Sequence, residues 1–214
     1  MIKRSLSLFV ALVMTVVCLT GCSAGFKTKK ALKAAKSYGM TEVTASQLAE
    51  RWNSGAITSQ DETIKKYLNI RNKICYKSKD SNEANDVFNS VYGFQRDSGK
   101  YAGLEELFCC EEEYGDVMLL VAVDEKTARM VYDYYLELLE PSNENSSTWV
   151  KGGYAYTLLV EPSETPGTAD YCGLYVKGKT LLIIESDISP EHDEKFLDYF
   201  CKELGVVSPL TLRK

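Results

Sequence analysis

Acidic side chains that could act as catalytic acids or metal ligands gather in one stretch of the sequence. They are Glu105, Glu106, Glu111, Glu112, Glu113 and Asp116. Paired carboxylates serve as acid and base in glycoside hydrolysis, and carboxylate oxygens bind calcium. The run Asp80, Asn82, Ala84 departs from a calcium loop at its third ligand position and lacks the glycine that should follow. We therefore expect a solvated acidic edge, with a carboxylate-dependent hydrolase as the less favoured alternative.

The single histidine, His192, lies in the acidic run 191–194, where a helix is expected to begin. No cysteine or carboxylate stands at the spacing of a zinc site around it. Cys201 lies nine residues further along the same helix, about 180° around its axis, so the two cannot form a Cys–His couple. The motifs of zinc proteases, serine hydrolases and phosphate-binding loops are absent from the sequence. The sequence thus predicts no catalytic residue, no metal site, no cofactor and no enzyme activity.

Seven cysteines offer thiol chemistry, of which Cys18 and Cys22 belong to an N-terminal segment unlike the rest. The remaining five are an odd number, so at least one thiol per chain must stay unpaired. Cys109 and Cys110 are adjacent and are expected on opposite faces of a strand.

Two pairings are open. Cys172 and Cys201 are both expected to face the core, either as a disulfide or, as we favour, as two free thiols. Cys75 could pair with Cys109 or Cys110.

The N-terminal segment has the layout of an export signal. Lys3 and Arg4 precede a dense apolar run, 6–17, and the next charged side chain is Lys27. The four residues Leu19, Thr20, Gly21 and Cys22 resemble the lipobox of bacterial prolipoproteins at every position.

This resemblance implies cleavage before Cys22, diacylation of its thiol, and anchoring of the protein to the outer, extracytoplasmic face of the cell membrane. It also implies that membrane lipid is a partner of the protein, through the acylated Cys22. An uncleaved signal anchor and a plain signal peptide with a chance cysteine are the alternatives. The expected organisation is a signal peptide at 1–21, a lipidated tether at 22–30 and a folded domain at 31–214.

Charge changes sign along the exported chain. Five lysines and no acid lie in 22–36, whereas 37–214 holds 18 basic and 30 acidic side chains, a net charge of −12. The lysines could attract an anionic leaflet or simply keep a linker soluble. The acidic body argues against nucleic-acid binding, which needs a clustered basic surface. The tether 23–30 would reach at most about 26–29 Å.

Apolar periodicity and capping residues predict an α+β fold, with an antiparallel or mixed sheet and helices packed on it in a single compact domain. Helices are expected at 31–38, 45–52, 60–68, 80–91, 125–139 and 191–204. Strands are expected at 73–77, 104–112, 117–123, 154–160, 171–176 and 180–185, with 142–149 as a polar loop. In layout alone the chain resembles small lipoproteins of Gram-positive bacteria that have no assigned function, so no activity follows.

The chain holds fourteen tyrosines against seven phenylalanines. Those expected on strands, with Trp149, could form a surface for a sugar, a peptide or another small ligand, although packing in the core is favoured. They are Tyr154, Tyr156, Tyr171 and Tyr175. We expect a non-catalytic interaction or envelope-associated module, and a ligand- or glycan-binding lipoprotein is the alternative.

Overall fold

A computed structural model describes residues 25–54, 73–91, 95–96, 99–100, 103–139, 145–151, 153–189 and 194–213. The lipobox with Cys18 and Cys22, the expected helix at 60–68 and His192 lie outside these residues. Within the described residues, no helix is both long and apolar enough to cross a bilayer.

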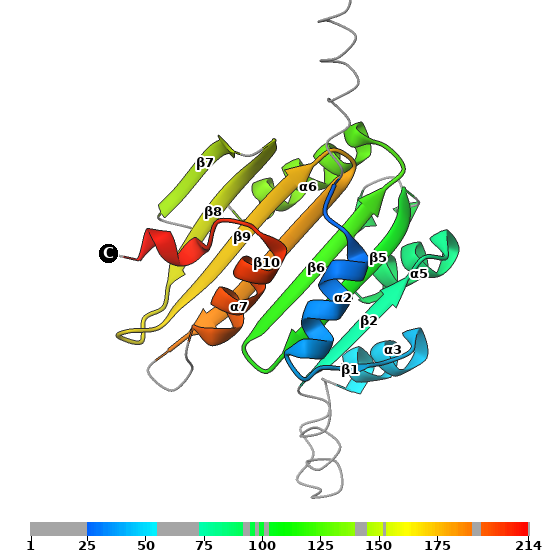
Figure 1. Ribbon diagram of the computed structural model, residues 1–214, viewed down its shortest axis with the longest axis horizontal. Coiled ribbons are helices and arrows are strands. Elements are labelled where there is room, and N and C mark those ends of the chain that lie inside the picture. The colour runs from blue at the N-terminus through cyan, green and yellow to red at the C-terminus, as the bar shows by residue number, and fades with distance from the viewer. Residues whose placement is uncertain are drawn as a thin grey trace, which may run out of the picture.

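The fold is an α+β domain built on one mixed sheet of eight strands in the order β1–β2–β5–β6–β10–β9–β8–β7 (Figure 1). Strands β1 and β2 are parallel, and all other neighbours are antiparallel. The strands are β1 (Thr41–Glu42), β2 (Ile74–Ser78), β5 (Leu104–Glu112), β6 (Gly115–Ala122), β7 (Asn145–Lys151), β8 (Tyr154–Pro162), β9 (Ala169–Lys177) and β10 (Thr180–Ile188). The short strands β3 (Gln95–Arg96) and β4 (Gly99–Lys100) form a separate ribbon.

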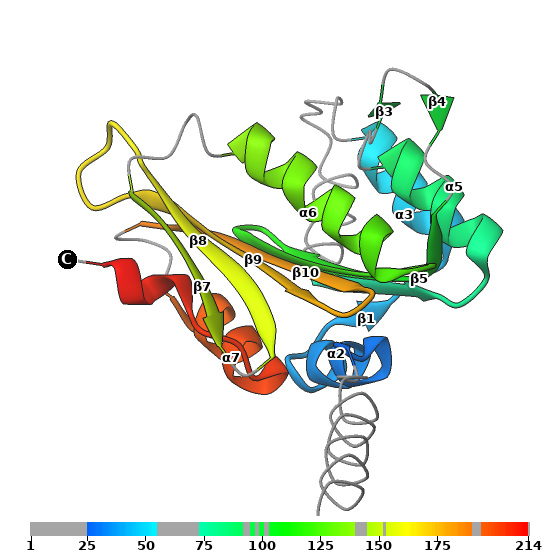
Figure 2. The ribbon, with the colours of Figure 1, turned by 90° about the horizontal axis from the view of Figure 1, so that it is seen from above.

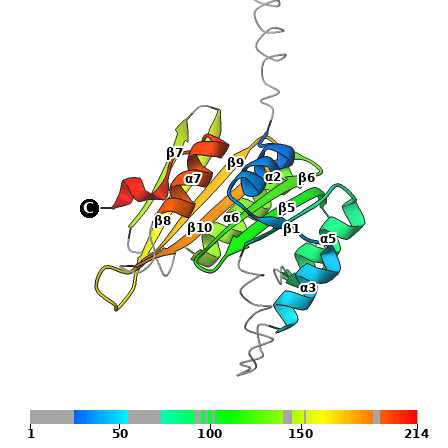
Figure 3. The same ribbon diagram turned by 60° about the horizontal axis from the view of Figure 1, so that its bottom comes forward.

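Helices cover both faces of the sheet (Figure 2). The helices α2 (Thr28–Ser37) and α7 (Lys195–Leu204) pack on one face, side by side (Figure 3), and we call it the α2 face. The helices α3 (Ala45–Ser54), α5 (Ser81–Val91) and α6 (Glu125–Leu139) lie on the other, the α6 face. Each face buries its own apolar core, with Phe108 and Phe200 in the first and Phe88 and Tyr132 in the second.

Side-chain caps explain where the helices begin. The Thr44 hydroxyl accepts from the Gln47 amide at 3.3 Å, and the Gln47 side chain accepts from the Thr44 amide at 2.9 Å, as a capping box requires. Asp124 accepts from the Thr127 amide at 2.7 Å at the start of α6. At the other end of α7, Gly205 ends the helix in the left-handed conformation with φ +78°.

The strand 104–112 and the helix 125–139 have the predicted bounds, and the strand at 73–77 is shifted by one residue. The predicted loop at 142–149 is wrong, because 145–151 form strand β7, which pairs with β8 along its whole length. A polar strand is tolerated there because β7 is an edge strand with one free side.

The expected boundary between tether and domain also needs correction. Helix α2 begins at Thr28 rather than at residue 31, and the Phe26 amide already donates to the Thr180 hydroxyl at 2.9 Å. The ring of Phe26 packs on Tyr154 with centroids 5.9 Å apart. The domain therefore begins at about residue 25, so only residues 22–24 of the predicted tether would lie outside it.

Candidate functional site

Acidic side chains form a row across the α6 face because the sheet register places them directly opposite one another. Glu111 on β5 faces Asp116 on β6, Asp116 faces Glu185 on β10, and Glu185 faces Cys172 on β9. Side chains opposite each other on antiparallel strands have Cβ atoms about 4.5–5.5 Å apart. Three carboxyl groups and one thiol thus lie side by side.

A second acidic row lies two residues further along the strands on the same face. Asp187 on β10 faces Asp170 on β9, and Asp170 faces Glu161 on β8. Residues two apart on a strand point to the same side, so the two rows belong to one surface. Together they extend from β5 to β8.

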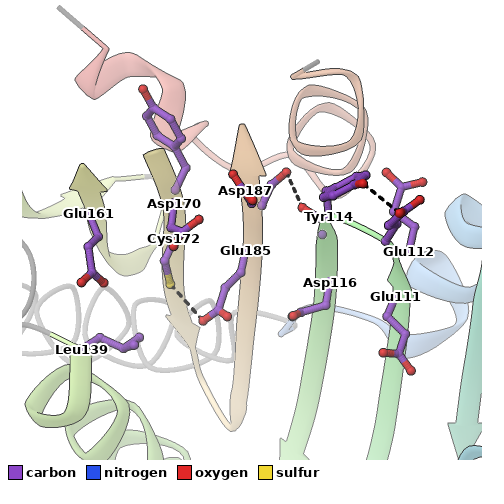
Figure 4. Close-up of a pocket in the computed structure, with 14 residues that line it drawn as sticks. Glu111, Glu112, Tyr114, Asp116, Leu139, Glu161, Asp170, Cys172, Glu185 and Asp187 are labelled. Atoms are coloured by element: carbon purple, nitrogen blue, oxygen red, sulfur yellow. Dashed lines mark hydrogen bonds between the residues drawn. The ribbon is translucent and has the colours of Figure 1, made fainter. Parts of the chain in front are cut away.

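These rows line a cleft of about 360 Å³ at the end of α6, where Leu139 forms part of its rim (Figure 4). The lining residues are Glu111, Glu112, Glu113, Tyr114, Gly115, Asp116, Leu139, Glu161, Asp170, Tyr171, Cys172, Glu185, Ser186 and Asp187. Eight of these fourteen residues are acidic and none is basic. We call this site the acidic cleft.

Burial and mutual repulsion raise the pKa values of the central carboxyl groups. The pKa of Asp116 lies well above its usual range, chiefly because the group is desolvated and further because Glu185 and Glu111 are close. Desolvation also raises the pKa of Glu185, although the Cys172 thiol donates to its carboxylate at 3.3 Å, which acts in the opposite direction. The carboxyl end of α6, which carries a partial negative charge, adds no compensation.

Two further groups complete the electrostatics of the acidic cleft. The Oδ1 atom of Asp187 is buried and accepts no hydrogen bond from the part of the chain that the structure describes. Asp170 is exposed at the rim, and its pKa is raised by partial desolvation and by the charges of Asp187 and Glu161. The described lining residues of the site therefore concentrate acidic groups and include no cation.

The predicted solvated acidic edge is only partly correct. Glu105 forms an ion pair with Lys179, and Glu106 accepts from the Thr28 hydroxyl. Glu111 and Asp116, by contrast, are half-buried and join the acidic cleft. The edge therefore contains carboxylates held by ion pairs or hydrogen bonds at the surface and others that lie in the cleft.

Glu112 faces the α2 side of the sheet, where it meets Lys73 at 3.4 Å and accepts from the Tyr38 hydroxyl at 3.3 Å. It reaches the cleft only at the rim. Its charge is compensated, unlike that of Asp116.

The expectation that Cys172 and Cys201 share one core is wrong. Cys172 packs on the α6 face beside Glu185, whereas Cys201 is buried in the core of the α2 face, so the sheet separates them. All five cysteines of the described chain are free thiols. Cys109 and Cys110 point to opposite faces, as predicted, and Cys110 lies opposite Cys75 in register.

The prediction of a ligand-binding surface formed by strand tyrosines is also wrong. The core of the α2 face buries Tyr156, Tyr171 and Tyr175. The alternation along their strands points them to the same side of the sheet as α7 and the C-terminal 3-10 helix, Pro209–Leu212. Tyr154 is partly buried and packs on Tyr156 with ring centroids 5.6 Å apart. The favoured alternative, core packing, is confirmed for these residues. Trp149 lies on strand β7, and its side chain is outside the described part.

The sequence analysis missed four of the eight acidic residues of the cleft, namely Glu161, Asp170, Glu185 and Asp187. One signal was present: Glu185 and Asp187 alternate on β10, which places both on one face. The alternation cannot reveal which strand lies beside β10, so it could not bring Asp116 to the site.

Among the described residues, no group of three or more His, Cys, Asp or Glu side chains has an arrangement that could hold a metal ion. Comparison of the chain with protein-family models, with curated proteins and with solved structures gave no match.

Proposed function

We propose that the protein is a lipoprotein of the outer face of a bacterial cell membrane, and that its acidic cleft binds a basic segment of an envelope partner. The observation that carries the second part is the lining of the cleft, in which the described residues include eight acidic ones and no basic one. The lipobox at 19–22 supports the first part. The protein then acts as an interaction module rather than as an enzyme.

A cationic ligand suits the cleft because it would remove the repulsion among carboxylates that the sheet holds close together. In the partly desolvated site each opposite charge is attracted more strongly than in bulk water. Arginine fits best, since its guanidinium binds a carboxylate through two parallel hydrogen bonds.

The extent of the acidic rows favours a peptide over a single ion. Four strand-to-strand steps separate β5 from β8, which amounts to about 19 Å. An extended peptide of about six residues covers the same distance. A segment with an arginine or lysine at every second position could place several cations along the rows.

Calorimetric titration with an extended peptide of alternating arginine and serine tests the binding proposal. We expect saturable binding to the wild-type protein and a loss of about 100-fold in affinity in the D116N/E185Q variant, since each charged hydrogen bond contributes roughly 1.5–3 kcal/mol. The variant E137Q/E164Q is the matched control, because both side chains are exposed and lie outside the cleft. Equal affinity in all three proteins would refute the site.

The anchor is tested separately by the C22A variant and by mass spectrometry of the mature N-terminus. We expect a diacylated Cys22 in the wild type and release or mis-sorting of the variant, because one residue bearing two acyl chains gives stable membrane attachment. An unprocessed leader, or a mature terminus without acyl mass, would refute the lipoprotein proposal and leave the binding proposal standing.

A carboxylate-dependent hydrolase is the second candidate, favoured by one observation. Asp116 and Glu185 lie directly opposite each other, and desolvation raises both of their pKa values, as a proton-donating carboxyl group requires. Hydrolysis of a glycan substrate that is abolished in D116N and unchanged in E164Q would support this candidate. Binding of the basic peptide without any hydrolytic activity would favour the interaction module.

A further inference from the structure

The α2 face carries charge of the opposite sign, and its source is helix α2. This helix buries Thr28, Ala31, Ala34 and Ala35 against the sheet. At 100° per residue, the lysines at 29, 33 and 36 fall on the side of the helix opposite these buried residues. All three are exposed, and α2 contains no acidic residue.

These lysines are largely uncompensated. Lys36 pairs with Glu42 at 2.5 Å, whereas Lys29, Lys30 and Lys33 form no ion pair with any residue that the structure describes. The neighbouring helix α7 is close to neutral on its exposed side, with Lys195 and Lys202 against Asp198 and Glu203. The exposed side of α2 is therefore the basic part of this face.

A recess continues the basic surface toward the N-terminus. Its volume is about 490 Å³, and its lining combines Lys27, Lys30 and Lys177 with the apolar side chains of Phe26, Tyr154 and Leu204. None of the described residues that line it is acidic. A recess lined by both lysine and apolar side chains matches a phospholipid, whose anionic phosphate lies next to apolar chains.

The position of Gly25 and Phe26, at the start of the folded domain, limits how far this surface could lie from a membrane to which Cys22 is anchored. The Phe26 amide binds the Thr180 hydroxyl at 2.9 Å, so the chain is held against the β9–β10 turn at this point. Three residue steps separate Gly25 from Cys22, which is at most about 10–11 Å. An acylated Cys22 would hold the recess and the start of α2 within that distance of the bilayer.

We propose that the exposed lysines of α2 and the recess beside Gly25 dock on the anionic headgroups of the membrane. This inference rests on the proposed lipid anchor and adds a defined orientation to it. Helices α2 and α6 lie on opposite sides of the sheet (Figure 2), and the acidic cleft lies at the end of α6. Docking through α2 would therefore turn the acidic cleft away from the bilayer. The cleft is then open to a partner, and its carboxylates are kept from the anionic surface.

Lysine accessibility in vesicles tests the orientation with the full lipidated protein. The protein is reconstituted either in phosphatidylcholine or in phosphatidylcholine with about one third phosphatidylglycerol. Acetylation of Lys30 is followed by mass spectrometry, with a free lysine peptide in solution as the reference. We expect Lys30 to react at least about fivefold more slowly on the anionic vesicles, the factor that one lysine contributes near such a surface, and high salt to abolish the difference.

Two variants with matched charge changes sharpen the test. In K29Q/K33Q the protection of Lys30 should fall below about twofold. In K126Q/R129Q, which removes two exposed charges from α6, the protection should remain. Equal reaction rates on neutral and anionic vesicles, or an equal loss in both variants, would overturn the docking proposal. Acyl mass on Cys22 is measured in the same samples, so that failure of the anchor is distinguished from failure of docking.

Discussion

The two faces of the sheet present opposite charges by different structural means. On α2 the lysines project from a helix into solvent, where flexible side chains can spread apart. In the acidic cleft, Asp116 and Glu185 are fixed on adjacent strands and cannot separate. Net charge alone therefore does not define a site: the helix gives a diffuse basic surface, which suits the proposed membrane docking, and the sheet gives a concentrated acidic site, which suits the proposed cationic ligand.

Reversing one charge at the rim of the cleft should have the largest effect. In the D170K variant the new lysine lies opposite both Asp187 and Glu161, so it forms internal ion pairs and occupies the place of the ligand. We expect the affinity for the basic peptide to fall by about 100-fold, as measured by calorimetry.

The control for D170K is E164K, which makes the same charge change at an exposed residue outside the cleft. Its affinity should fall by less than about threefold. A similar loss in both variants would mean that long-range charge, rather than the cleft, drives binding.

Gly173 and Cys172 are neighbours on β9 that lie on opposite faces of the sheet, so substitutions at the two positions report how tightly each face is packed. A Cβ on Gly173 would lie 2.1 Å from the Tyr175 hydroxyl on the α2 face, and that hydroxyl donates to the Val207 carbonyl at 2.5 Å. We expect G173A to lower the free energy of unfolding by about 1–3 kcal/mol. C172A, on the cleft face, should change it by less than about 1 kcal/mol. Urea unfolding curves measure both, and equal costs would contradict the assigned facing of β9.

The acidic cleft should destabilise the fold at neutral pH. A raised pKa means that the folded protein retains a proton that the unfolded chain has released, so stability falls as the pH rises above the ordinary carboxyl range. The D116N variant removes this effect and two repulsive cross-strand pairs, those of Asp116 with Glu111 and with Glu185. We expect it to be about 1 kcal/mol more stable than wild type at pH 7.5 and equally stable near pH 4. Thermal unfolding at the two pH values measures this difference. A variant that is less stable than wild type at pH 7.5 would contradict the repulsion between Asp116 and its acidic neighbours.

The α2 lysines should contribute least to folding. K29Q/K33Q is expected to change the free energy of unfolding by less than about 0.5 kcal/mol, because both side chains are exposed and form no ion pair with a described residue. Chemical denaturation in low and high salt measures this change. A larger effect would mean that these lysines serve the fold rather than a surface function.

Local signals predicted much of the fold. The bounds of α6 follow from the Asp124 cap, the apolar period of its buried side and Pro141, and the β9–β10 turn follows from the sequence at 177–179. Strand β7 was not predictable, because its polar residues resemble a loop and its structure depends on pairing with β8. Edge pairing is decided by the partner rather than by local preference.

The acidic cleft required information that the sequence does not hold locally. Asp116 and Glu185 come together only because β10 returns to pair with β6 after the β7–β9 meander. The same reason explains the error about Cys201: the period of α7 shows which side of the helix is apolar, but not which face of the sheet it covers.

The most direct test of the account is proton release when the basic peptide binds, measured by calorimetry at a series of pH values from the ordinary carboxyl range up to neutral, each in two buffers of different ionisation enthalpy. A cation in the cleft lowers the raised pKa values of Asp116 and Glu185, so the wild-type protein should release protons and the D116N/E185Q variant should bind weakly and release none. Binding without proton release, or the same release from both proteins, would contradict the claim that these buried carboxyl groups form the binding site.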